Sequence, residues 1–406
     1  MDCDVVVVGG GLVGLAQARA LAPSGLAVTL IDSASPPPEP SPLPSLAPEE
    51  ESVGGWDARV YAISPGNAAL LSELGVWPSL DFSRVASVER MEVYGDDGAS
   101  RIVFSAYEAG RAELAFIVEG RQLQRALESA LAGQAGLDWR RPALPADLVW
   151  ASDRVVLSLE GGEAIEARLV IGADGADSWV RRQADIGVSE KSYRQRAVVA
   201  NFRCERPHRN TAFQWFRDDG VLALLPLPGN HVSLVWSTWD EHAAELACLG
   251  PEALAGRVEQ ACRGALGQLA QVTPPLAFPL RLVKVKALVA PRVALVGDAA
   301  HVIHPLAGQG VNLGFQDVRL LAGVLRERGP VADCGDYFLL RRYERARRED
   351  VALMQLATDG LARLFSARTC GVGWLRNAGL RLTNAIAPVK TLLVQHALKD
   401  GCPTVP

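Results

Sequence analysis

The N-terminal segment of the chain limits the possible folds more than any other feature. Asp4–Val8 is an almost continuous run of valines, which predicts a buried strand, and Gly9-Gly10-Gly11-Leu12-Val13-Gly14 follows it at once. These residues match the pattern G-x-G-x-x-G, and a helix is expected over Leu12–Ala22 directly after it. Gly9 permits a tight turn, Gly11 lets backbone approach a pyrophosphate, and Gly14 lets the helix pack on the strand. The segment therefore predicts the start of a Rossmann-like βαβ unit.

A second predicted strand, Ala27–Ile31, follows this helix and ends at Asp32. A carboxylate at the tip of that strand can accept hydrogen bonds from a ribose diol. An isolated G-x-G-x-x-G occurs often by chance. Because strand, helix, second strand and terminal acid are all present in order, we expect a site for an adenine dinucleotide here.

A second glycine-bearing stretch lies near the other end of the chain, from Pro291 to Asp317. Val293–Val296 predicts another buried strand, Gly297-Asp298 turns the chain, and a helix is expected from about Gly310. The connection contains further glycines, which allow backbone to lie close to a ligand. An ordinary strand–loop–helix junction would have a similar composition. An acid at a strand end, followed by a glycine-rich loop and a helix N-terminus, is nevertheless well suited to a phosphate-bearing ligand.

These two stretches, together with Gly172-Ala173-Asp174-Gly175-Ala176-Asp177-Ser178, resemble the single-component FAD-dependent aromatic hydroxylases, which have the para-hydroxybenzoate hydroxylase fold. Within them, residues 57–64 (DARVYAIS) and 304–314 (HPLAGQGVNLG) are similar to the subgroup that hydroxylates ring carbons in ubiquinone biosynthesis. The resemblance covers most of the chain in the expected order. It is more specific for fold and cofactor than for substrate.

The resemblance implies an α/β fold in which a Rossmann-like FAD-binding domain, βαβ with a mixed sheet, is interleaved with a substrate domain built on an antiparallel sheet. We expect residues 1–80, 111–190 and 286–350 to form the FAD-binding domain, 81–110 and 191–285 the substrate domain, and 351–406 C-terminal helices. Alternating strands such as Val198–Cys204 and His231–Trp239 predict the antiparallel sheet, and a helical stretch, Glu241–Leu269, covers it. Aromatic residues in a sheet are usually core. We expect this of most of Trp215, Phe216, Trp236 and Trp239, and expect some of them to wall an apolar cavity.

Three further residues are expected to contact FAD because of the resemblance. Arg59 lies where the family has an arginine near the pyrophosphate, which a guanidinium can bind through two hydrogen bonds, although a surface salt bridge is the alternative. Arg121 opens a predicted helix at a place where the family commonly has an arginine against the cofactor. Asp174 lies at a strand-to-helix turn, where it could equally cap the helix, although Asp177 or Ser178 is the better N-cap.

The loop after Asp298 is expected to surround the flavin ring. The resemblance places His304 and Pro305 beside it, as the residues closest to catalysis. Asp298 should accept hydrogen bonds from the ribityl hydroxyls, and the backbone N–H groups of the segment 308–312 should stabilise negative charge on the reduced ring. The residues expected in this part of the FAD site are Gly297, Asp298, Gly308, Gln309, Gly310, Val311 and Asn312.

The chemistry that the resemblance implies uses FAD and oxygen. The chain contains only one dinucleotide fingerprint, so NAD(P)H would bind transiently to reduce the flavin. Oxygen would then form a flavin hydroperoxide that hydroxylates an electron-rich ring, in a site from which water is excluded. We expect no side-chain nucleophile. We also expect no metal, because Pro305 interrupts any helix that could present His301 and His304 together.

Bulk composition excludes several other classes of protein. A net charge of −5 gives no basic field for nucleic acid, and the seven cysteines are odd in number and form no C-x-x-C, as expected for reduced thiols. The N-terminus has no signal-peptide pattern, and no apolar run is long enough to cross a bilayer, so we expect a cytoplasmic protein. Apolar residues at helical spacing in 374–398 predict C-terminal helices that pack on the body or contact a membrane peripherally.

The leading functional hypothesis is a hydroxylase of a polyprenylated phenol in ubiquinone biosynthesis, with other proteins of that pathway as possible partners. The same chemistry on a small soluble phenol is a close alternative. Two further alternatives are a prenyl-chain reductase with the same fold and a flavin-binding subunit without turnover. The proline-rich stretch 33–52 predicts an exposed, extended loop, either a lid over the adenosine end or an insertion without a role.

Overall fold

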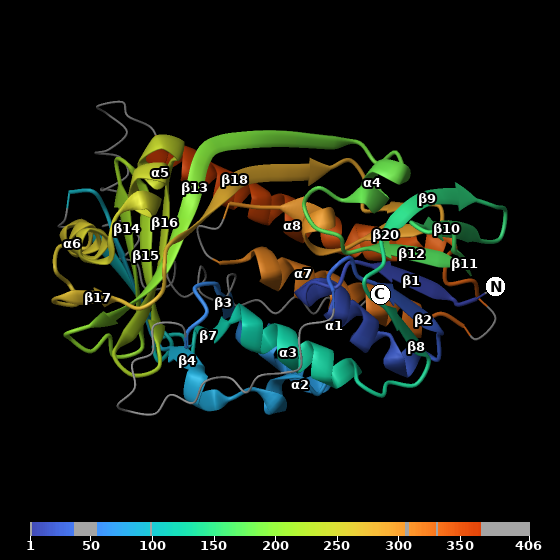
Figure 1. Ribbon diagram of the computed structural model, residues 1–406, viewed down its shortest axis with the longest axis horizontal. Coiled ribbons are helices and arrows are strands. Elements are labelled where there is room, and N and C mark those ends of the chain that lie inside the picture. The colour runs from blue at the N-terminus through green and yellow to red at the C-terminus, as the bar shows by residue number, and fades with distance from the viewer. Residues whose placement is uncertain (1, 36–54, 98–99, 305–307, 330–331, 367–406) are drawn as a thin grey trace.

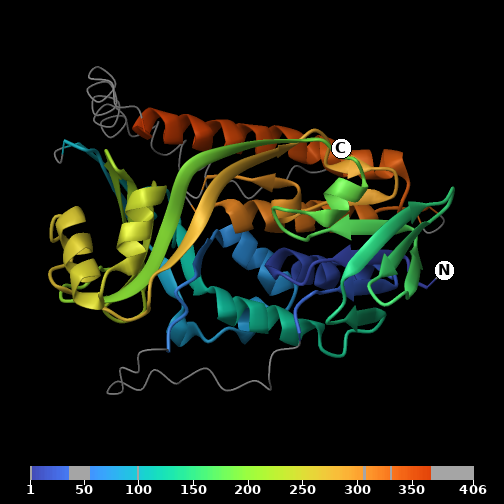
Figure 2. The same cartoon turned by 45° about the horizontal axis from the view of Figure 1, so that its top comes forward.

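The computed structural model describes residues 2–35, 55–97, 100–304, 308–329 and 332–366. Most of the predicted proline-rich loop, Pro305 and the predicted C-terminal helices 374–398 lie outside these residues. The described part forms two large and two small sheets with helices around them, and the longest helix extends alongside both large sheets (Figures 1 and 2).

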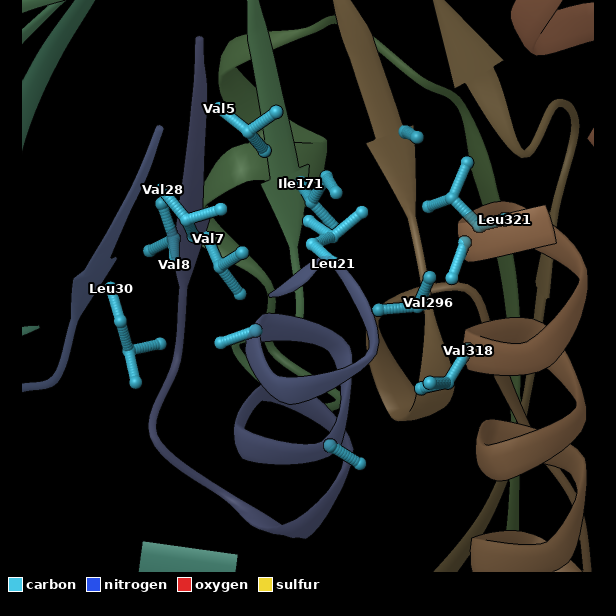
Figure 3. Packing of buried hydrophobic residues seen from close by; sticks show 14 of the residues in the cluster. Val5, Val7, Val8, Leu21, Val28, Leu30, Ile171, Val296, Val318 and Leu321 are labelled. Atoms are coloured by element: carbon cyan, nitrogen blue, oxygen red, sulfur yellow. The ribbon is translucent and has the colours of Figure 1, made fainter. Parts of the chain in front are cut away.

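A six-stranded sheet with the order β19-β20-β12-β1-β2-β8 carries the N-terminal motif. Its strands are β1 (Val5–Val8), β2 (Val28–Ile31), β8 (Leu137–Arg140), β12 (Leu169–Gly172), β19 (Val289–Ala290) and β20 (Val293–Leu295). All neighbours are parallel except β19 and β20, so the sheet is mixed, as predicted. Val7 lies between Leu30 and Ile171, and the β1 valines are 0–3% exposed (Figure 3). A strand covered on both faces requires such a continuous apolar run.

Helices cover this sheet. They are α1 (Leu12–Ala20), α2 (Pro65–Glu73), α3 (Gly120–Leu131), α4 (Trp179–Gln183), α7 (Gly310–Arg326) and α8 (Tyr337–Ser366). α1 contacts both α3 and α7, and α8 packs along α7. In Figure 3, Val318 and Leu321 of α7 lie close to Val296, directly after β20. The helix that follows the second glycine-bearing turn is therefore part of the same core as the first.

A second sheet has nine strands in the order β21-β18-β13-β16-β15-β14-β5-β6, with β17 paired to β13. Their bounds are β5 (Arg90–Tyr94), β6 (Arg101–Ser105), β13 (Val188–Cys204), β14 (Thr211–Arg217), β15 (Gly220–Leu227), β16 (His231–Trp239), β17 (Leu269–Gln271), β18 (Leu276–Val285) and β21 (His301–Val302). The pairing is antiparallel except between β14 and β5, which brings the predicted hairpin 81–110 into this sheet. The helices α5 (Asp240–Cys248) and α6 (Pro251–Ala261) cover one face.

Two smaller sheets complete the fold. β3 (Val60–Ile63), β7 (Ala115–Glu119) and β4 (Ala86–Val88) form one in the order β3-β7-β4, and both β4 and β7 contact β15. β9 (Pro145–Trp150), β10 (Val155–Leu159) and β11 (Ala164–Ala167) form the other. Short 3-10 helices lie at Ala22–Ser24, Trp77–Ser79, Phe82–Arg84 and Gly297–Ala299 (η4). In the part of the chain that the model describes, we find no helix that has both the length and the apolar character needed to cross a bilayer.

Several predicted elements differ from the structure. The helical stretch Glu241–Leu269 is wrong as one element, because Gly250-Pro251 starts a second helix and Leu269 begins β17. We also expected one strand over Ala164–Ile171 and, with Leu137–Arg140, a β-meander; instead residues 164–171 form two strands in different sheets, β11 and β12, and β8 (Leu137–Arg140) belongs to the six-stranded sheet. The predicted boundary between residues 350 and 351 falls inside α8.

The aromatic residues of the antiparallel sheet are core, as predicted for most of them. Trp215 and Trp236 are 4% and 1% exposed and pack in the cluster that contains residues of α5 and α6, away from the opposite face of the sheet. Phe216 is 5% exposed and lies in a small cluster with Val93. The burial of these rings confirms the prediction that most of this group is core.

Candidate functional site

The two glycine-bearing turns, nearly three hundred residues apart in sequence, touch each other. A Cβ atom built on Gly297 would lie 3.1 Å from Cγ1 of Val13, and one built on Gly314 would lie 2.6 Å from Cγ2 of Val13. Val13 therefore fills a hollow that exists only because residues 297 and 314 have no side chains. The contact fixes the N-terminus of α1 beside the turn that carries Asp298.

The glycines of the first turn have different surroundings. Gly9 has φ +115°, and a Cβ there would lie 2.4 Å from the carbonyl oxygen of Ala173, while a Cβ on Gly14 would lie 1.9 Å from the oxygen of Gly9. Nothing lies within 4 Å of a Cβ on Gly11. Gly11 is also the N-cap of α1 and provides no side-chain cap, so the first N–H groups of the helix are open to a ligand. An anion such as a pyrophosphate fits this arrangement.

Asp298 provides the acidic side chain of the second turn. Its side chain is accessible, yet the protein around it desolvates the carboxylate and raises the pKa of Asp298. His301, Arg59 and Arg281 act in the opposite direction, which shows that their charges lie close by. An accessible carboxylate within a protein recess is a suitable hydrogen-bond acceptor for ligand hydroxyls.

Three buried side chains from three helices hold the backbone around Asp298. Asp317 of α7 accepts a hydrogen bond from the Gly297 N–H at 2.9 Å. Arg181 of α4 donates to the carbonyl of Ala299 at 2.9 Å, and Tyr343 of α8 donates to the carbonyl of Leu295 at 2.8 Å. None of these three residues was predicted from the sequence as part of the site.

Asn312 is a predicted site residue whose side chain has a structural task. Its Oδ1 accepts from the Ser64 N–H at 3.0 Å and from Asn67 at 2.8 Å, and its Nδ2 donates to the carbonyl of Ala62 at 2.7 Å. The amide thus ties the β3–α2 connection to the first turn of α7. α7 begins without a side-chain cap, so the N–H groups near Gly310 and Val311 remain available at its N-terminus.

Asp57 holds the backbone of Arg59 next to that of Arg121. The Asp57 carboxylate accepts the backbone N–H of Arg59 at 3.0 Å and that of Arg121 at 2.8 Å. Both arginine side chains are exposed, and the Arg59 guanidinium lies over the ring of Phe278, 5.0 Å from its centroid. Burial is the largest influence on the pKa of Tyr61 and raises it, while Arg59 lowers it and Asp298 raises it. These opposing influences place Arg59 and Asp298 around the same recess.

The two remaining predicted acids lie at the strand ends where they were expected. Asp32 is 8% exposed, accepts the N–H of Ala34 at 3.0 Å, and has its carboxylate against Gly10. Asp174 accepts from the Ser178 hydroxyl at 2.5 Å and from the Val180 N–H at 3.0 Å. Ser178 is the N-cap of α4, as predicted, and Asp174 caps the same helix, so its carboxylate is engaged within the turn.

His304 is buried, at 2% exposure, and burial lowers its pKa to about 4. Its Nε2 lies 3.4 Å from Oε1 of Gln195, and its ring meets the ring of Tyr193 edge-on at 4.9 Å. His301 instead bonds to Asp317 at 2.7 Å. The two histidines therefore point to different partners. Among the described residues, no group of three or more His, Cys, Asp or Glu side chains could hold a metal ion.

One face of the nine-stranded sheet is turned toward these residues. On strands β13, β15 and β16, alternate side chains pack with α5 and α6, so the intervening ones face the opposite way. That opposite face meets the site, since Asn201 donates to the carbonyl of Asp57 at 2.8 Å, and Leu225 and Ala62 pack against the same small hydrophobic cluster. The residues at these positions are Ala197, Val199, Asn201, Arg203, Val221, Ala223, Leu225, Ser233, Val235 and Ser237. Arg203, next to the end of β13, is charged, and the other nine are uncharged.

A pocket of about 420 Å³ lies elsewhere, at the edge of the sheet near the β5–β6 turn. It is lined by polar groups, including Arg217, Asp218 and Arg263, and by the rings of Trp215 and Phe216, but by none of the residues expected to bind FAD. We therefore assign the functional site to the meeting point of the glycine turns.

Comparison with known proteins agrees with this geometry. Residues 143–355 match the family model described as FAD binding domain. Ubiquinone hydroxylase UbiL of Rhodospirillum rubrum is 35% identical over 97% of this chain and 89% of its own length. The 3-demethoxyubiquinol 3-hydroxylase of Escherichia coli is 37% identical over 97% of this chain and 98% of its own. The crystal structure of p-nitrophenol 4-monooxygenase PnpA from Pseudomonas putida has a TM-score of 0.75, with 18% identity and 96% coverage of both chains, and shows the shared fold.

The two relatives are aligned over almost their whole length, so the comparison includes both sheets as well as the glycine turns. The chain therefore belongs to the FAD-dependent aromatic hydroxylases, in the subgroup that includes the hydroxylases of ubiquinone biosynthesis.

Proposed function

We propose that this FAD-dependent monooxygenase hydroxylates the aromatic ring of a polyprenylated phenol on the pathway to ubiquinone. The observation that carries the proposal is the contact of Val13 with Gly297 and Gly314, which forms one site from two distant turns. The names of the relatives support the substrate class. When bound, FAD supplies the redox chemistry by accepting a hydride from NAD(P)H and activating O₂ for transfer to the ring.

The residues of the two turns would hold FAD in a single orientation. Gly9, Gly11 and Gly14, with Leu12 and Val13 at the start of α1, would accommodate the pyrophosphate. Asp32 would accept from the adenosine ribose, and Asp298 from the ribityl hydroxyls. Arg59 and Arg121, aligned by Asp57, would neutralise phosphate charge. Asp174 would contribute backbone rather than its carboxylate, which already caps α4.

The N-terminus of α7 would interact with the flavin ring. Its first backbone N–H groups, within 308–312, would stabilise negative charge on the reduced ring, because a helix N-terminus carries partial positive charge. His304 would lie beside this loop as a neutral residue, since its pKa is about 4. The role proposed for Pro305 stays a prediction, because that residue lies outside the described part of the chain.

The central part of this sheet face carries no charged side chain, which supports a hydrophobic substrate. A site that recognises a small soluble phenol by a carboxylate would need a cation facing the ring, and strands β13, β15 and β16 present none between Ala197 and Asn201, Val221 and Leu225, or Ser233 and Ser237. A wall without charged side chains also holds less water, which would favour transfer of oxygen to the substrate over its loss to solvent. The observation favours the prenylated phenol over the soluble one.

Quinone profiling by mass spectrometry tests this proposal. Cells that lack the gene should accumulate a prenylated intermediate with one ring hydroxyl missing. The wild-type gene should restore ubiquinone, and the Asp298→Ala variant should not. The purified enzyme should form product only when O₂ is present; product formed without O₂ would identify a reductase, and an unchanged quinone profile would refute the pathway.

Contact with a membrane or with other ubiquinone-biosynthesis proteins stays a prediction. The segment expected to make that contact, 374–398, lies beyond the described residues, and so does most of the proline-rich stretch 33–52.

A further inference from the structure

Asp317 and Arg347 form a fully buried ion pair behind the turn that carries Asp298. Nε of Arg347 donates to Oδ1 of Asp317 at 2.6 Å, and both side chains are 0% exposed. The other carboxylate oxygen accepts two hydrogen bonds, from the Gly297 N–H at 2.9 Å and from His301 at 2.7 Å. Burial alone would raise the pKa of Asp317, but His301 and Arg347 outweigh it and lower the pKa. The carboxylate is therefore ionised and fully engaged.

Arg347 also binds the start of α7. Its guanidinium donates to the carbonyl of Leu313 at 3.2 Å and to Gln316 at 3.2 Å. Leu313 follows directly after the segment 308–312, whose N–H groups we assign to the flavin ring. One ion pair thus holds both parts of the second turn, the Gly297–Asp298 backbone and the N-terminus of α7.

A contribution to stability alone does not explain this pair. Two charges lose their hydration when they are buried, and an apolar pair of similar volume is often as stable or more stable. An apolar pair could not, however, accept the N–H of Gly297. Gly297 has φ +61° and lies against Val13, so its backbone conformation is tightly limited.

We propose that Asp317 and Arg347 are positioning residues for FAD: they set the distance between the Asp298 carboxylate and the N-terminus of α7, the two groups between which the ribityl chain and flavin ring are held. This inference rests on the FAD contacts assigned above to Asp298 and α7. Neither residue touches the cofactor. Their effect is transmitted through the Gly297 N–H and the carbonyl of Leu313.

The test separates positioning from folding by comparing single and double variants. Arg347→Met leaves the Asp317 charge buried without its partner, which should lower both the melting temperature of the apoprotein and its FAD affinity. The double variant Asp317→Leu with Arg347→Met removes both charges and should recover most of the melting temperature. It should still bind FAD about 10- to 100-fold more weakly, as is typical when the outer partners of a binding group are lost. FAD titration followed by flavin fluorescence measures the dissociation constant.

Two matched variants complete the experiment. Arg292→Met breaks a less buried ion pair, to Asp333 at 2.7 Å, at the opposite end of β20, and should leave FAD affinity unchanged. Asp298→Ala tests the underlying assignment directly. If Asp298→Ala binds FAD normally, the proposed contacts fail; if Asp298→Ala loses FAD but the double variant binds it with wild-type affinity, only the positioning role is refuted.

A double variant that does not fold would still leave the question decidable. Asp317→Asn has nearly the same shape but lacks the charge, and should also weaken FAD binding, with an altered visible spectrum of any flavin that remains bound. Wild-type affinity and spectrum in Asp317→Asn would overturn the proposal.

Discussion

Substitution of Gly11 by alanine and of Gly14 by alanine should affect different properties, FAD binding in the first case and stability in the second, although both glycines belong to one motif. Gly11 has an extended backbone, φ −77° and ψ 178°, which alanine adopts without strain, and no protein atom lies within 4 Å of the added Cβ. Gly14→Ala would place its Cβ 1.9 Å from the carbonyl oxygen of Gly9, 1.5 Å short of an ordinary 3.4 Å contact. The first substitution should impair ligand binding, and the second should impair the fold.

The sizes of the two effects follow from these contacts. Gly11→Ala should change the free energy of unfolding of the apoprotein by less than about 1 kcal/mol, the usual cost of alanine at an N-cap. If the methyl group displaces the pyrophosphate from one charged hydrogen bond, about 1.5–3 kcal/mol of binding energy is lost, roughly a 10- to 100-fold rise in the FAD dissociation constant. Gly14→Ala should cost about 3 kcal/mol or more in stability, because neither backbone segment can move freely.

Two measurements on deflavinated protein distinguish these outcomes. Thermal unfolding should give nearly the same midpoint for Gly11→Ala and the wild type, and a much lower one for Gly14→Ala. FAD titration should then show weak binding by the stable Gly11→Ala protein. Normal FAD affinity in Gly11→Ala would refute the reasoning, because it would mean that the open space beside residue 11 is not where the pyrophosphate binds.

Three other substitutions test the electrostatics of the molecule. Asp298→Asn should weaken FAD binding yet raise the melting temperature of the apoprotein at neutral pH. Folding raises the pKa of Asp298 through desolvation, so at any pH above the pKa of this group in the unfolded chain, the ionised carboxylate destabilises the folded state. An unchanged or lower melting temperature would contradict this. Gln17→Leu should stabilise the protein by about 1–2 kcal/mol in urea titrations, because its amide is 0% exposed and lacks any hydrogen-bond partner in the described structure; a loss of stability would show that the amide has a partner. His304→Gln should lose less stability than the wild type when the pH falls from 6.5 to about 4. Over that interval the unfolded chain binds a proton at His304 and the folded chain, in which the histidine is buried, does not. This difference costs the wild type up to about 3 kcal/mol of stability, which the variant should keep. Parallel stability profiles of variant and wild type across that interval would disprove it.

Local patterns in the sequence were sufficient for the elements that form the site. The valine run and its glycines predicted β1 and α1, and the second stretch predicted β20 and a helix from Gly310, which is where α7 begins. Strand burial and glycine turns are determined by neighbouring residues, so they are visible in a short window. That the two turns meet was implied by the family resemblance, and the contact of Val13 with Gly297 confirms it.

The interactions that hold the site in place were not visible in this way. Interleaved arginines and acids in 337–350 are typical of a solvated helix face, and this interpretation is wrong for Arg347, which is 0% exposed. A signal was present, because Leu340, Tyr343, Arg347 and Val351 recur at helical spacing and all are buried. The charge of Arg347 concealed its place in this stripe, and its partner Asp317 lies thirty residues away in sequence.

Asn312 shows the same limit for a neutral side chain. It was predicted for its backbone N–H, and the structure adds hydrogen bonds from its amide to Ser64 and Asn67, about 250 residues earlier in the chain. A pattern within one segment has no information on such partners. β3 and β7 were missed for a related reason, since each is short and stabilised mainly by pairing with the other.

One long helix, α8, connects the turn that carries Asp298 with the nine-stranded sheet. α8 has 30 residues and is therefore about 45 Å long, enough to contact both sheets. Toward its N-terminal end Arg347 bonds to the site through Asp317, while farther along Gln355 donates to the carbonyl of Val283 in β18 at 3.1 Å. One turn later Asp359 accepts from Lys191 of β13 at 2.8 Å. Because a hydroxylase transfers oxygen only over a short distance, ring and flavin must be placed precisely relative to each other. We infer that α8, which bonds through Asp317 to the turn carrying Asp298 and through Gln355 to β18, fixes the distance between the proposed flavin site and the proposed substrate sheet.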